Sequence, residues 1–420
     1  MASHVPSGPK HTPSVVVIGG GPAGLMAAGR AAELGAHVLL IERNQRLAVK
    51  LRITGKGRCN LTNTAPTDRF IEAFSPNGRF LYGPLSRFSP EDLRTMLGRL
   101  GVPTVEERGG RVFPATGSAS DVADALERWA RHNGVRVVRN CRARSLAVQQ
   151  GAVVGVVTEG AGTVEADRIV VATGGLSYPR TGSTGDGYEL ARQVGHTVVP
   201  CRPALVPLET AEEWPKTLQG VALRNVRATL FVDGRASASE FGEMLFTHFG
   251  LSGPIILTLS RSIVPVLGKA RVEVSLDLKP ALSPERLDAR LVREFHSKRM
   301  FRNYLPELSV RALGPVLAAH SGIPEHQPLN GITSSQRRRL VAVVKDLRMT
   351  IARARPIEEA IVTAGGVCLK EIDPRSMQSK LVQGLYFAGE VLDLDAVTGG
   401  FNLQAAFTTG WVAGDSAGTG

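Results

Sequence analysis

The chain has 420 residues, of which 43% are hydrophobic, so it is long enough for two or three domains with substantial cores. No apolar stretch reaches the roughly 20 residues of a membrane span, because Arg261 interrupts the most apolar segment at 251–267. The four cysteines form no Cys-x-x-Cys pair, which argues against a metal site and a disulfide framework, and the net charge of +12 would suit an anionic partner. Residues 1–13 lack an apolar signal core, so we expect a disordered leader and a cytoplasmic protein.

The first predicted elements are those of a dinucleotide-binding unit. A strand at 14–18, a glycine turn, a helix from near Pro22 and a strand at 37–41 follow one another, and Glu42 ends the second strand. The helix N-terminus would face phosphates with unpaired N–H groups, and Glu42 would accept hydrogen bonds from ribose hydroxyls.

Three glycines of this unit have separate expected roles. Gly19 allows the tight turn, Gly21 lets the backbone approach a pyrophosphate, and Gly24 lets the helix pack closely on the strand. Arg43 would suit a 2′-phosphate, so this segment alone could hold NAD, NADP or FAD. The alternative is a glycine-rich turn without a ligand.

Further strands and helices are expected along the rest of the first half. The hairpin at 149–151 suggests the β-meander that is usual in flavin-binding versions of this fold, and the strand near 168–172 ends in glycines, where open α/β sheets bind ligands. A further helix is predicted to be capped by residues 118–121 and to run to about His132. The other predicted helices cover 67–73, 77–87, 90–100 and 188–194, and the predicted strands cover 135–138, 143–148, 152–157 and 168–172.

The pattern changes between 198 and 362, which we interpret as an inserted α+β substrate domain. Its predicted strands cover 228–232 and 271–278, and its predicted helices cover 284–295, 309–319 and 334–347. The style of the first half returns afterwards, so segments 14–197 and 363–420 would together form a Rossmann-like FAD-binding domain of the glutathione-reductase type.

The segment 50–63 is rich in cations and amides and follows the ribose-binding acid. Its cations, Lys50, Arg52, Lys56 and Arg58, can neutralise diphosphate charge, while Asn60 and Thr62 can hydrogen-bond the rim of a heterocycle. Cys59 is expected to pack beneath the loop, since the sequence shows no resolving cysteine. The alternative is a basic surface loop.

A second glycine-rich segment lies near the C-terminus. A strand ends in Gly389 and Glu390, and two glycines then open an apolar helix from about Asn402 to Val412. The acid would contact a ribityl chain, and the helix N-terminus would stabilise negative charge on a reduced flavin. The alternative is a helix capped by glycines.

Several motifs together resemble one family. The segments G-G-G-P-A-G, I-T-G-K-G-R-C-N-L-T-N, A-T-G-G-L-S-Y-P, L-F-T-H-F-G-L-S-G-P, T-A-G-G-V and A-G-E-V-L-D-L-D-A-V-T-G-G-F-N-L-Q-A-A are similar to those of the YhiN-type FAD-dependent oxidoreductases, with their BaiN and aminoacetone oxidase-like members. The resemblance spans 14–414 and implies non-covalent FAD, but no single substrate. The FAD contacts that it implies are Gly19, Gly21, Ala23, Gly24, Glu42, Arg43, Lys50, Thr54, Gly55, Arg58, Cys59, Asn60, Thr173, Gly174, Gly389, Glu390, Gly400, Asn402, Leu403 and Gln404.

Three residues are candidates for catalysis. His248 could donate a proton to a carbonyl or enolate, or it could be a structural histidine. Tyr178 and Arg180 could form an oxyanion clamp, or the tyrosine could simply pack before its proline.

The leading hypothesis is an oxidoreductase that moves a hydride through flavin N5 to or from a small carbonyl, steroid-like or amine substrate. NAD(P)H could serve as a transient electron donor. The first rival is a nucleic-acid-associated flavoprotein of the tRNA-modifying type that uses the basic stretch 286–348, although that stretch also suits a solvated helical face, which we favour. The second rival is a non-catalytic flavin sensor. The sequence fixes neither the substrate nor the oligomeric state.

Overall fold

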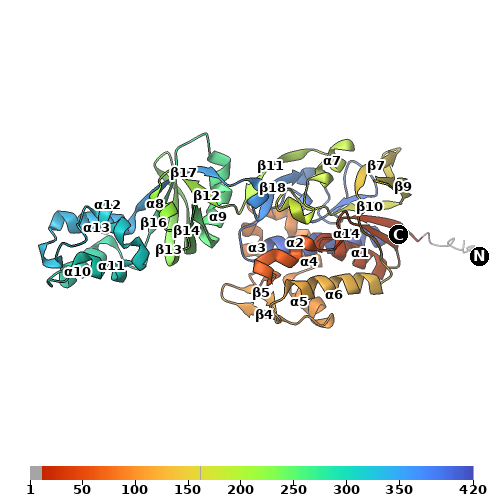
Figure 1. The fold of residues 1–420 in the computed structure, drawn as a ribbon. Coiled ribbons are helices and arrows are strands. Elements are labelled where there is room, and N and C mark those ends of the chain that lie inside the picture. The colour runs from red at the N-terminus through yellow and green to blue at the C-terminus, as the bar shows by residue number, and fades with distance from the viewer. Residues whose placement is uncertain (1–11, 161, 420) are drawn as a thin grey trace, which may run out of the picture. The chain divides into compact units, whose positions relative to one another are not determined.

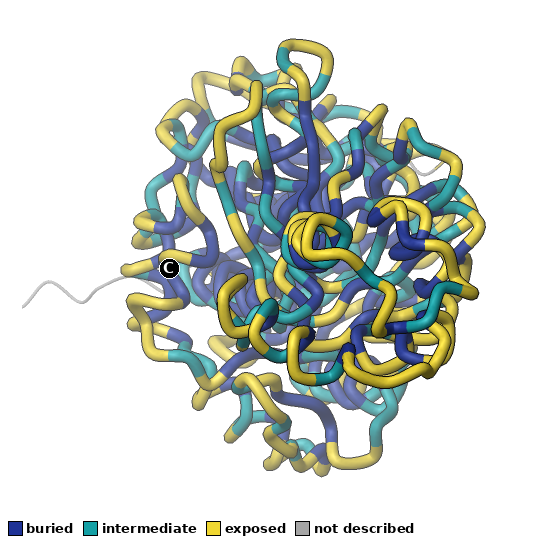
Figure 2. Tube along the Cα trace, turned by 90° about the vertical axis from the view of Figure 1, so that its left-hand side faces the viewer, coloured by how far each residue is buried: buried dark blue, intermediate teal, exposed yellow. Residues whose placement is uncertain are grey.

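The computed structural model describes residues 12–160 and 162–419, and these form two compact units (Figure 1). Unit 1 contains the chain up to Arg202 and again from Ile361, and unit 2 is Pro203–Ala360. Each unit has its own apolar core, and Figure 2 shows buried stretches of chain with exposed loops around them. Of the predicted disordered leader, residues 1–11 lie outside the described residues.

The centre of unit 1 is a five-stranded parallel sheet. Its order is β19-β10-β1-β2-β6, so the first strand of the chain lies in the middle. The three strands β19, β10 and β1 are short apolar runs that are buried almost throughout, as expected for a parallel sheet covered on both faces, whereas the edge strand β6 has no buried residue. Their bounds are Ser14–Ile18 (β1), His37–Ile41 (β2), Arg136–Val138 (β6), Arg168–Val171 (β10) and Leu385–Phe387 (β19).

Two helices of unit 1, α1 (Pro22–Glu33) and α14 (Phe401–Gly418), pack backbone to backbone. A Cβ added at Gly410 would lie 2.3 Å from the carbonyl oxygen of Ala23, and one at Gly414 would lie 2.3 Å from that of Ala27. The two helices therefore run parallel. Gly410 contacts the start of α1, and α14 begins nine residues earlier, at Phe401. At 1.5 Å per residue, its N-terminus extends about 13 Å beyond that of α1, so an extended dinucleotide can reach both helix N-termini.

The remaining elements of unit 1 surround this arrangement. β7–β9 form an antiparallel meander, β3, β5 and β4 form a small sheet, and β11 pairs with β18. The helices are α2 (Val49–Ile53), α3 (Thr67–Ala73), α4 (Tyr82–Arg87), α5 (Pro90–Arg99), α6 (Ala119–His132) and α7 (Asp186–Gln193). The strands are β3 (Thr62–Asn63), β4 (Thr104–Glu107), β5 (Arg111–Pro114), β7 (Ala143–Gln149), β8 (Ala152–Thr158), β9 (Gly162–Glu165), β11 (Val198–Ala204) and β18 (Val362–Val367).

Unit 2 is a closed six-stranded barrel of order β12-β15-β14-β13-β16-β17, with helices inserted between β16 and β17. The strands are β12 (Leu208–Thr210), β13 (Ala222–Val232), β14 (Arg235–Thr247), β15 (Gly250–Ser252), β16 (Val272–Asp277) and β17 (Leu347–Ala354). The helices are α8 (Trp214–Thr217), α9 (Pro254–Ile263), α10 (Pro284–Glu294), α11 (Phe301–Leu308), α12 (Gly314–Ser321) and α13 (Ser334–Lys345). Figure 1 shows α10–α13 grouped at one end of the barrel.

The predicted architecture, an α/β domain with a parallel sheet, a meander and an insert, is confirmed. Several elements differ from the expectations. The segment at 77–87 begins as a 3-10 turn, and the helix expected at 309–319 begins at Gly314. β14 was missed because only two of its thirteen residues are buried and most of its first half is polar or small, so the apolar alternation is weak.

No helix within the described residues combines the length and the apolar character needed to cross a membrane.

Candidate functional site

The glycine turn after β1 has the geometry that its sequence predicts. Gly19 has a φ of +103°, and a Cβ at this position would lie 2.6 Å from the carbonyl oxygen of Ala172. A Cβ at Gly24 would lie 1.8 Å from the carbonyl oxygen of Gly19, so only glycine allows this helix-to-turn approach. Gly21 is the N-cap of α1, and a Cβ there would meet nothing within 4 Å. The N–H groups at the start of α1 are therefore open to a ligand such as a diphosphate.

Glu42, at the end of β2, accepts hydrogen bonds at both of its carboxylate oxygens. Glu42 is 7% exposed, its Oε2 accepts a hydrogen bond from the Gly20 N–H at 2.8 Å, and its Oε1 accepts one from the Asn44 N–H at 2.8 Å. Burial raises the pKa of this carboxyl group, although the two N–H donors act in the opposite direction. The carboxylate is thus fixed beside the glycine turn, where ribose hydroxyls could reach it.

The cations near the glycine turn mostly have protein partners. Arg52 pairs with Asp124 at 2.5 Å, and Arg58 pairs with Glu107 while its guanidinium lies 4.4 Å from the ring centroid of Phe113. The two arginines are therefore already neutralised by protein acids.

Arg43 and Lys56 differ in whether they have protein partners. Arg43 donates to Thr184 and to Asp186, the latter at 3.3 Å, so it is occupied by protein groups and is not free for a 2′-phosphate. Lys56 is exposed and forms no ion pair within the described part of the chain. Of the four cations in 50–63, Lys50, Arg52 and Arg58 have acidic partners, and Lys56 has none among the described residues.

Lys50 joins the segment 50–63 to the C-terminal half of unit 1. Its Nζ lies 2.7 Å from Oε2 of Glu390 and 2.5 Å from Oγ of Ser177. The other oxygen of Glu390 accepts from the Ser177 hydroxyl at 3.0 Å and from the Thr363 N–H at 2.9 Å. Glu390 follows β19 and Ser177 lies in the loop after β10, so the network lies at the carboxyl ends of neighbouring parallel strands, where α/β sheets bind ligands.

A second set of contacts joins the segment 50–63 to the start of α14. The Asn60 amide accepts a hydrogen bond from the Gly400 N–H at 3.1 Å and donates to the Thr62 carbonyl at 3.2 Å in the orientation that satisfies both ends. Gly400 has a φ of +101°, and a Cβ there would lie 2.3 Å from the Thr62 carbonyl oxygen. The Asn63 amide donates to the Gly399 carbonyl at 3.0 Å. The two segments predicted to surround a flavin are thus adjacent.

Three polar atoms at these segments are buried without a partner. Oγ1 of Thr62, Oγ1 of Thr173 and Oε1 of Gln404 have no hydrogen bond to any described residue. Gln404 lies in the first turn of α14, and Thr62 contacts the glycine that caps this helix. Buried polar atoms normally have partners, so the oxygens of Thr62 and Gln404 fit a ligand with polar edges, such as the pyrimidine-like side of a flavin, whereas Thr173 lies in the loop after β10.

The other predicted cofactor residues have mainly backbone or packing roles. Thr54 donates to the Leu51 carbonyl, and Gly55 and Gly174 have positive φ. The Asn402 amide holds the loop before α14, since it accepts from the Ala396 N–H at 2.9 Å and donates to the Ala396 carbonyl at 3.1 Å. The remaining members of the set, Ala23, Gly389 and Leu403, lie at or beside the N-termini of α1 and α14.

Cys59 is fully buried, as expected for a residue that packs beneath the loop. Burial raises the pKa of its thiol to about 12. The protein therefore holds this sulfur as an unreactive thiol at neutral pH.

The three candidate catalytic residues are exposed. Tyr178 has a φ of +53°, an uncommon conformation for a bulky residue, and directly follows Ser177 of the Lys50 network; Arg180 lies two residues further on. His248 lies in unit 2, in the turn between β14 and β15, and its ring packs edge-on against Phe249. Its imidazole has no hydrogen-bond partner among the described residues.

Two residues of the network were not identified from the sequence. Ser177 and Thr363 both lie in motifs of the family resemblance, A-T-G-G-L-S-Y-P and T-A-G-G-V, but a lone hydroxyl gives no signal of its partner. No group of three or more His, Cys, Asp or Glu side chains arranged to hold a metal occurs within 12–160 and 162–419.

The chain is similar to several known proteins. A family model described as the HI0933-like protein Rossmann domain matches residues 13–416. The chain is 31% identical over 411 residues to the 3-dehydro-bile acid delta(4,6)-reductase of Clostridium scindens, covering 96% of this chain and 98% of the relative. It is 30% identical over 398 residues to the ribosomal RNA dihydrouridine synthase of Haemophilus influenzae, covering 94% and 96%.

The fold is also similar to that of a solved structure, the 3-ketosteroid-delta4-(5alpha)-dehydrogenase of Rhodococcus jostii RHA1. The TM-score is 0.53 with 15% identity, and the match covers 98% of both chains.

Proposed function

This chain belongs to the HI0933-like family, and from that premise we propose that it is an FAD-dependent oxidoreductase that reduces a carbon–carbon double bond conjugated with a carbonyl group. The observation that carries the proposal is the pair of helix N-termini, those of α1 and α14, with the buried and unpartnered oxygens of Thr62 and Gln404 beside the second one. The names of the two whole-chain relatives support the reaction class, because a steroid dienone and a uracil ring both contain a double bond conjugated with a carbonyl.

When bound, FAD supplies the hydride from its N5 atom. The chain itself binds and orients the cofactor: the N–H groups at Gly21 hold the diphosphate, and Glu42 accepts from the ribose. The N-terminus of α14 would stabilise negative charge on a bound flavin. Lys50 and Glu390 fix the loops between these two ends.

The substrate takes the hydride on the carbon β to its carbonyl and a proton on the carbon α to it. His248 and Tyr178 are the proposed sources of that proton or of a hydrogen bond to the carbonyl oxygen, with Arg180 beside the tyrosine. NADH or NADPH is the proposed class of hydride donor.

The first test is the cofactor itself. We expect the purified protein to be yellow and to release FAD, and not FMN, on denaturation. In an anaerobic cuvette, NADH or NADPH should bleach the flavin and a steroid dienone or uridine-containing RNA should restore its absorbance. Colourless protein that cannot be reconstituted with FAD would contradict the proposal.

A second candidate is the same reaction on uridine within RNA. Two observations favour it: the 30% identity to the ribosomal RNA dihydrouridine synthase over nearly the whole chain, and the basic stretch in unit 2. The hydride step is the same for a small-molecule dienone and for an RNA base. The two substrates differ in the groups around the double bond that the protein must bind.

A further inference from the structure

The helices α10–α13, residues 284–345, carry a concentrated positive charge, and we call this segment the helical subdomain. It contains eleven Lys or Arg and five Asp or Glu. The rest of unit 2, which is mainly the barrel, contains eleven of each and is neutral. An arginine-rich composition of the whole chain would raise the charge of the barrel as well, so it does not explain this difference.

Ion pairing separates the cations of the helical subdomain into two sets. Four of them have acidic partners: Arg290 with Glu294, Arg299 with Glu307, Arg337 with Asp288, and Lys345 with Asp277 of β16. The other seven are exposed and form no ion pair with any described residue; these free cations are Arg286, Arg293, Lys298, Arg302, Arg311, Arg338 and Arg339. Only two acids of the subdomain, Glu285 and Glu325, are likewise outside the ion pairs.

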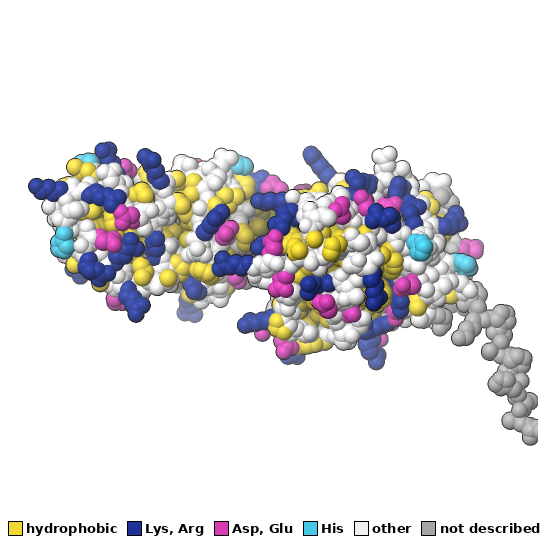
Figure 3. Space-filling view, turned by 90° about the horizontal axis from the view of Figure 1, so that it is seen from below, with side chains coloured by type: hydrophobic (Ala, Val, Ile, Leu, Met, Phe, Trp, Pro, Cys, Tyr) yellow, Lys and Arg dark blue, Asp and Glu magenta, His cyan; other side chains and the backbone are white. Residues whose placement is uncertain are grey.

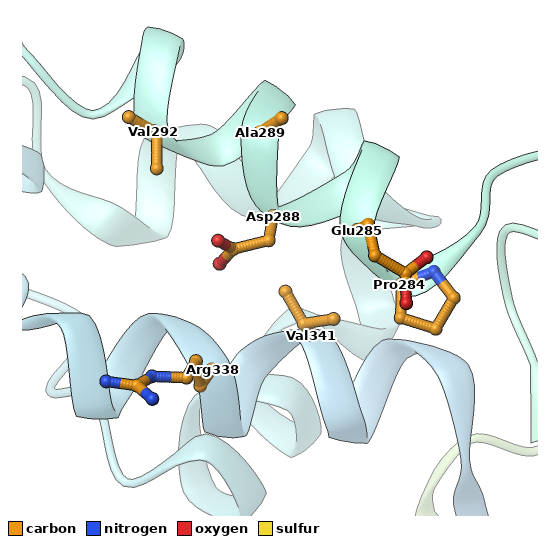
Figure 4. A pocket seen from close by; sticks show the side chains of 7 residues that line it. All are labelled: Pro284, Glu285, Asp288, Ala289, Val292, Arg338 and Val341. Carbon is orange, nitrogen blue, oxygen red and sulfur yellow. The ribbon is translucent and has the colours of Figure 1, made fainter.

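The three consecutive arginines Arg337, Arg338 and Arg339 differ in their contacts. Arg337 is held by Asp288 at 2.8 Å, and Arg339 donates to the Ser321 carbonyl at 3.1 Å. Arg338 borders an open groove of about 640 Å³ between α10 and α13 (Figure 4). The floor of this groove includes Val292 and Val341, and Glu285 lines it as well, so the groove itself does not attract an anion.

Apart from Arg338, the free cations do not line that groove and are distributed over several helices. On the face shown in Figure 3, dark blue side chains are spread over the helical end of unit 2, with few magenta ones between them. Phe295, Phe301 and Tyr304, which are all of the Phe, Tyr and Trp residues of the subdomain, are buried. The surface therefore offers charge and guanidinium donors, but no aromatic faces on which bases could stack.

We propose that the free cations of the helical subdomain bind the phosphate backbone of folded, largely double-helical RNA. The inference rests on the proposed function, in its form with uridine in RNA as substrate. Guanidinium groups pair with phosphate oxygens without reading the base, so this surface holds the RNA irrespective of sequence, and selection of the uridine belongs to the flavin site. A dienone of steroid size needs no such surface.

The test uses the full-length FAD-loaded protein and a fluorescein-labelled RNA hairpin of about 20 base pairs, long enough for a backbone-reading surface. The variant carries Arg286→Gln, Arg293→Gln, Lys298→Gln and Arg302→Gln. The matched control carries Arg79→Gln, Arg99→Gln, Arg128→Gln and Arg136→Gln, four exposed arginines of unit 1 that form no ion pair with a described residue. Both variants lose the same net charge.

Fluorescence anisotropy is measured as a function of salt concentration. Each phosphate contact contributes about 0.9 to the magnitude of the slope of log K against log salt concentration. With four cations removed, the slope of the subdomain variant should be smaller in magnitude by about 3 to 4. The slope of the control variant should equal that of the wild type. Absence of binding by the wild type at low salt, or an equal loss in both variants, would overturn the proposal.

Two further measurements separate this inference from the proposed function. FAD content and anaerobic flavin reduction by NADH or NADPH should be the same in the wild type and the subdomain variant. If neither protein holds FAD, the proposed function fails while the binding result still stands. If both reduce a dienone but neither binds the hairpin, the function holds and this inference is overturned.

Discussion

The Nζ of Lys50 lies 2.7 Å from Oε2 of Glu390, although the two residues are 340 positions apart in the chain. Both side chains are only about one-fifth exposed, and Ser177 bridges them. The pair connects helix α2, in the cation-rich segment after β2, to the glycine-rich segment after β19. It therefore joins the two segments that the sequence assigns to one cofactor.

We expect Lys50→Met and Glu390→Gln each to lower the free energy of unfolding by about 2 kcal/mol, because each leaves a half-buried partner without its counter-charge. The double variant should lose less than the sum, with a coupling of about 1 kcal/mol in a double-mutant cycle. Chemical denaturation followed by tryptophan fluorescence measures these values. Strict additivity would show that the two side chains act independently.

Gly21→Ala and Gly24→Ala should have different effects. A Cβ at Gly21 meets no protein atom within 4 Å, so the variant should fold like the wild type yet bind FAD at least about tenfold more weakly, because the methyl group points where a diphosphate would lie. A Cβ at Gly24 would collide with the Gly19 carbonyl, so this variant should lose about 1 to 3 kcal/mol of stability.

Gly98→Ala is the control for these two variants, since it also meets open space but lies in α5. Thermal unfolding and FAD titration of the apoprotein test all three. Unchanged FAD affinity in Gly21→Ala would show that the diphosphate does not bind at the start of α1.

Cys59 should resist thiol reagents in the folded protein. Its pKa of about 12 and its complete burial keep it protonated and inaccessible at neutral pH, whereas Cys368 is only half-buried. Mass spectrometry after a timed reaction with iodoacetamide should find Cys368 labelled first and Cys59 labelled only after denaturation. Rapid labelling of native Cys59 would instead indicate an accessible thiolate.

We expect His248→Ala to keep its FAD and to lose about 100- to 10,000-fold in kcat/KM for the conjugated substrate, as for removal of a proton donor. His37→Ala is the control, because His37 is also exposed but begins β2, at the opposite end of that strand from Glu42. Steady-state kinetics as a function of pH provides the measurement. An unaltered rate in His248→Ala would assign this histidine a structural role only.

His196 should make the stability of unit 1 depend on pH. Its Nδ1 lies 2.9 Å from Glu371 and its Nε2 lies 2.8 Å from the Ser379 hydroxyl. Burial lowers the pKa of His196, although Glu371 acts against this effect. A depressed pKa means that the contribution of neutral His196 is complete above its ordinary pKa and is lost as the pH falls through the folded-state value.

The melting temperature of the wild type should therefore decrease as the pH falls from about 7 to about 5, across the usual histidine pKa. His196→Gln should be less stable at neutral pH and should show a smaller decrease over this range. Parallel profiles for the two proteins would mean that other groups cause the pH dependence.

Much of the nucleotide-binding fold could be predicted from the sequence because its signals are local. The apolar strand at 14–18, the glycines at 19–24 and Glu42 lie within one short βαβ unit, so their spacing already specifies the turn and the helix N-terminus. The capped helix that begins after Ser118 was predicted for the same reason: the Ser118 hydroxyl accepts from the nearby Asp121 N–H.

The tertiary structure decided which side chains meet. Lys50 and Glu390, and Asn60 and Gly400, come from segments hundreds of residues apart, and no local pattern specifies such pairs. The same holds for charge. The sequence determined that residues 286–348 are basic. Only the folded chain shows that Arg337 pairs with Asp288, while Arg286 and Arg302 have no acidic partner among the described residues. Composition fixes the number of charges, whereas their pairing depends on which helices pack together.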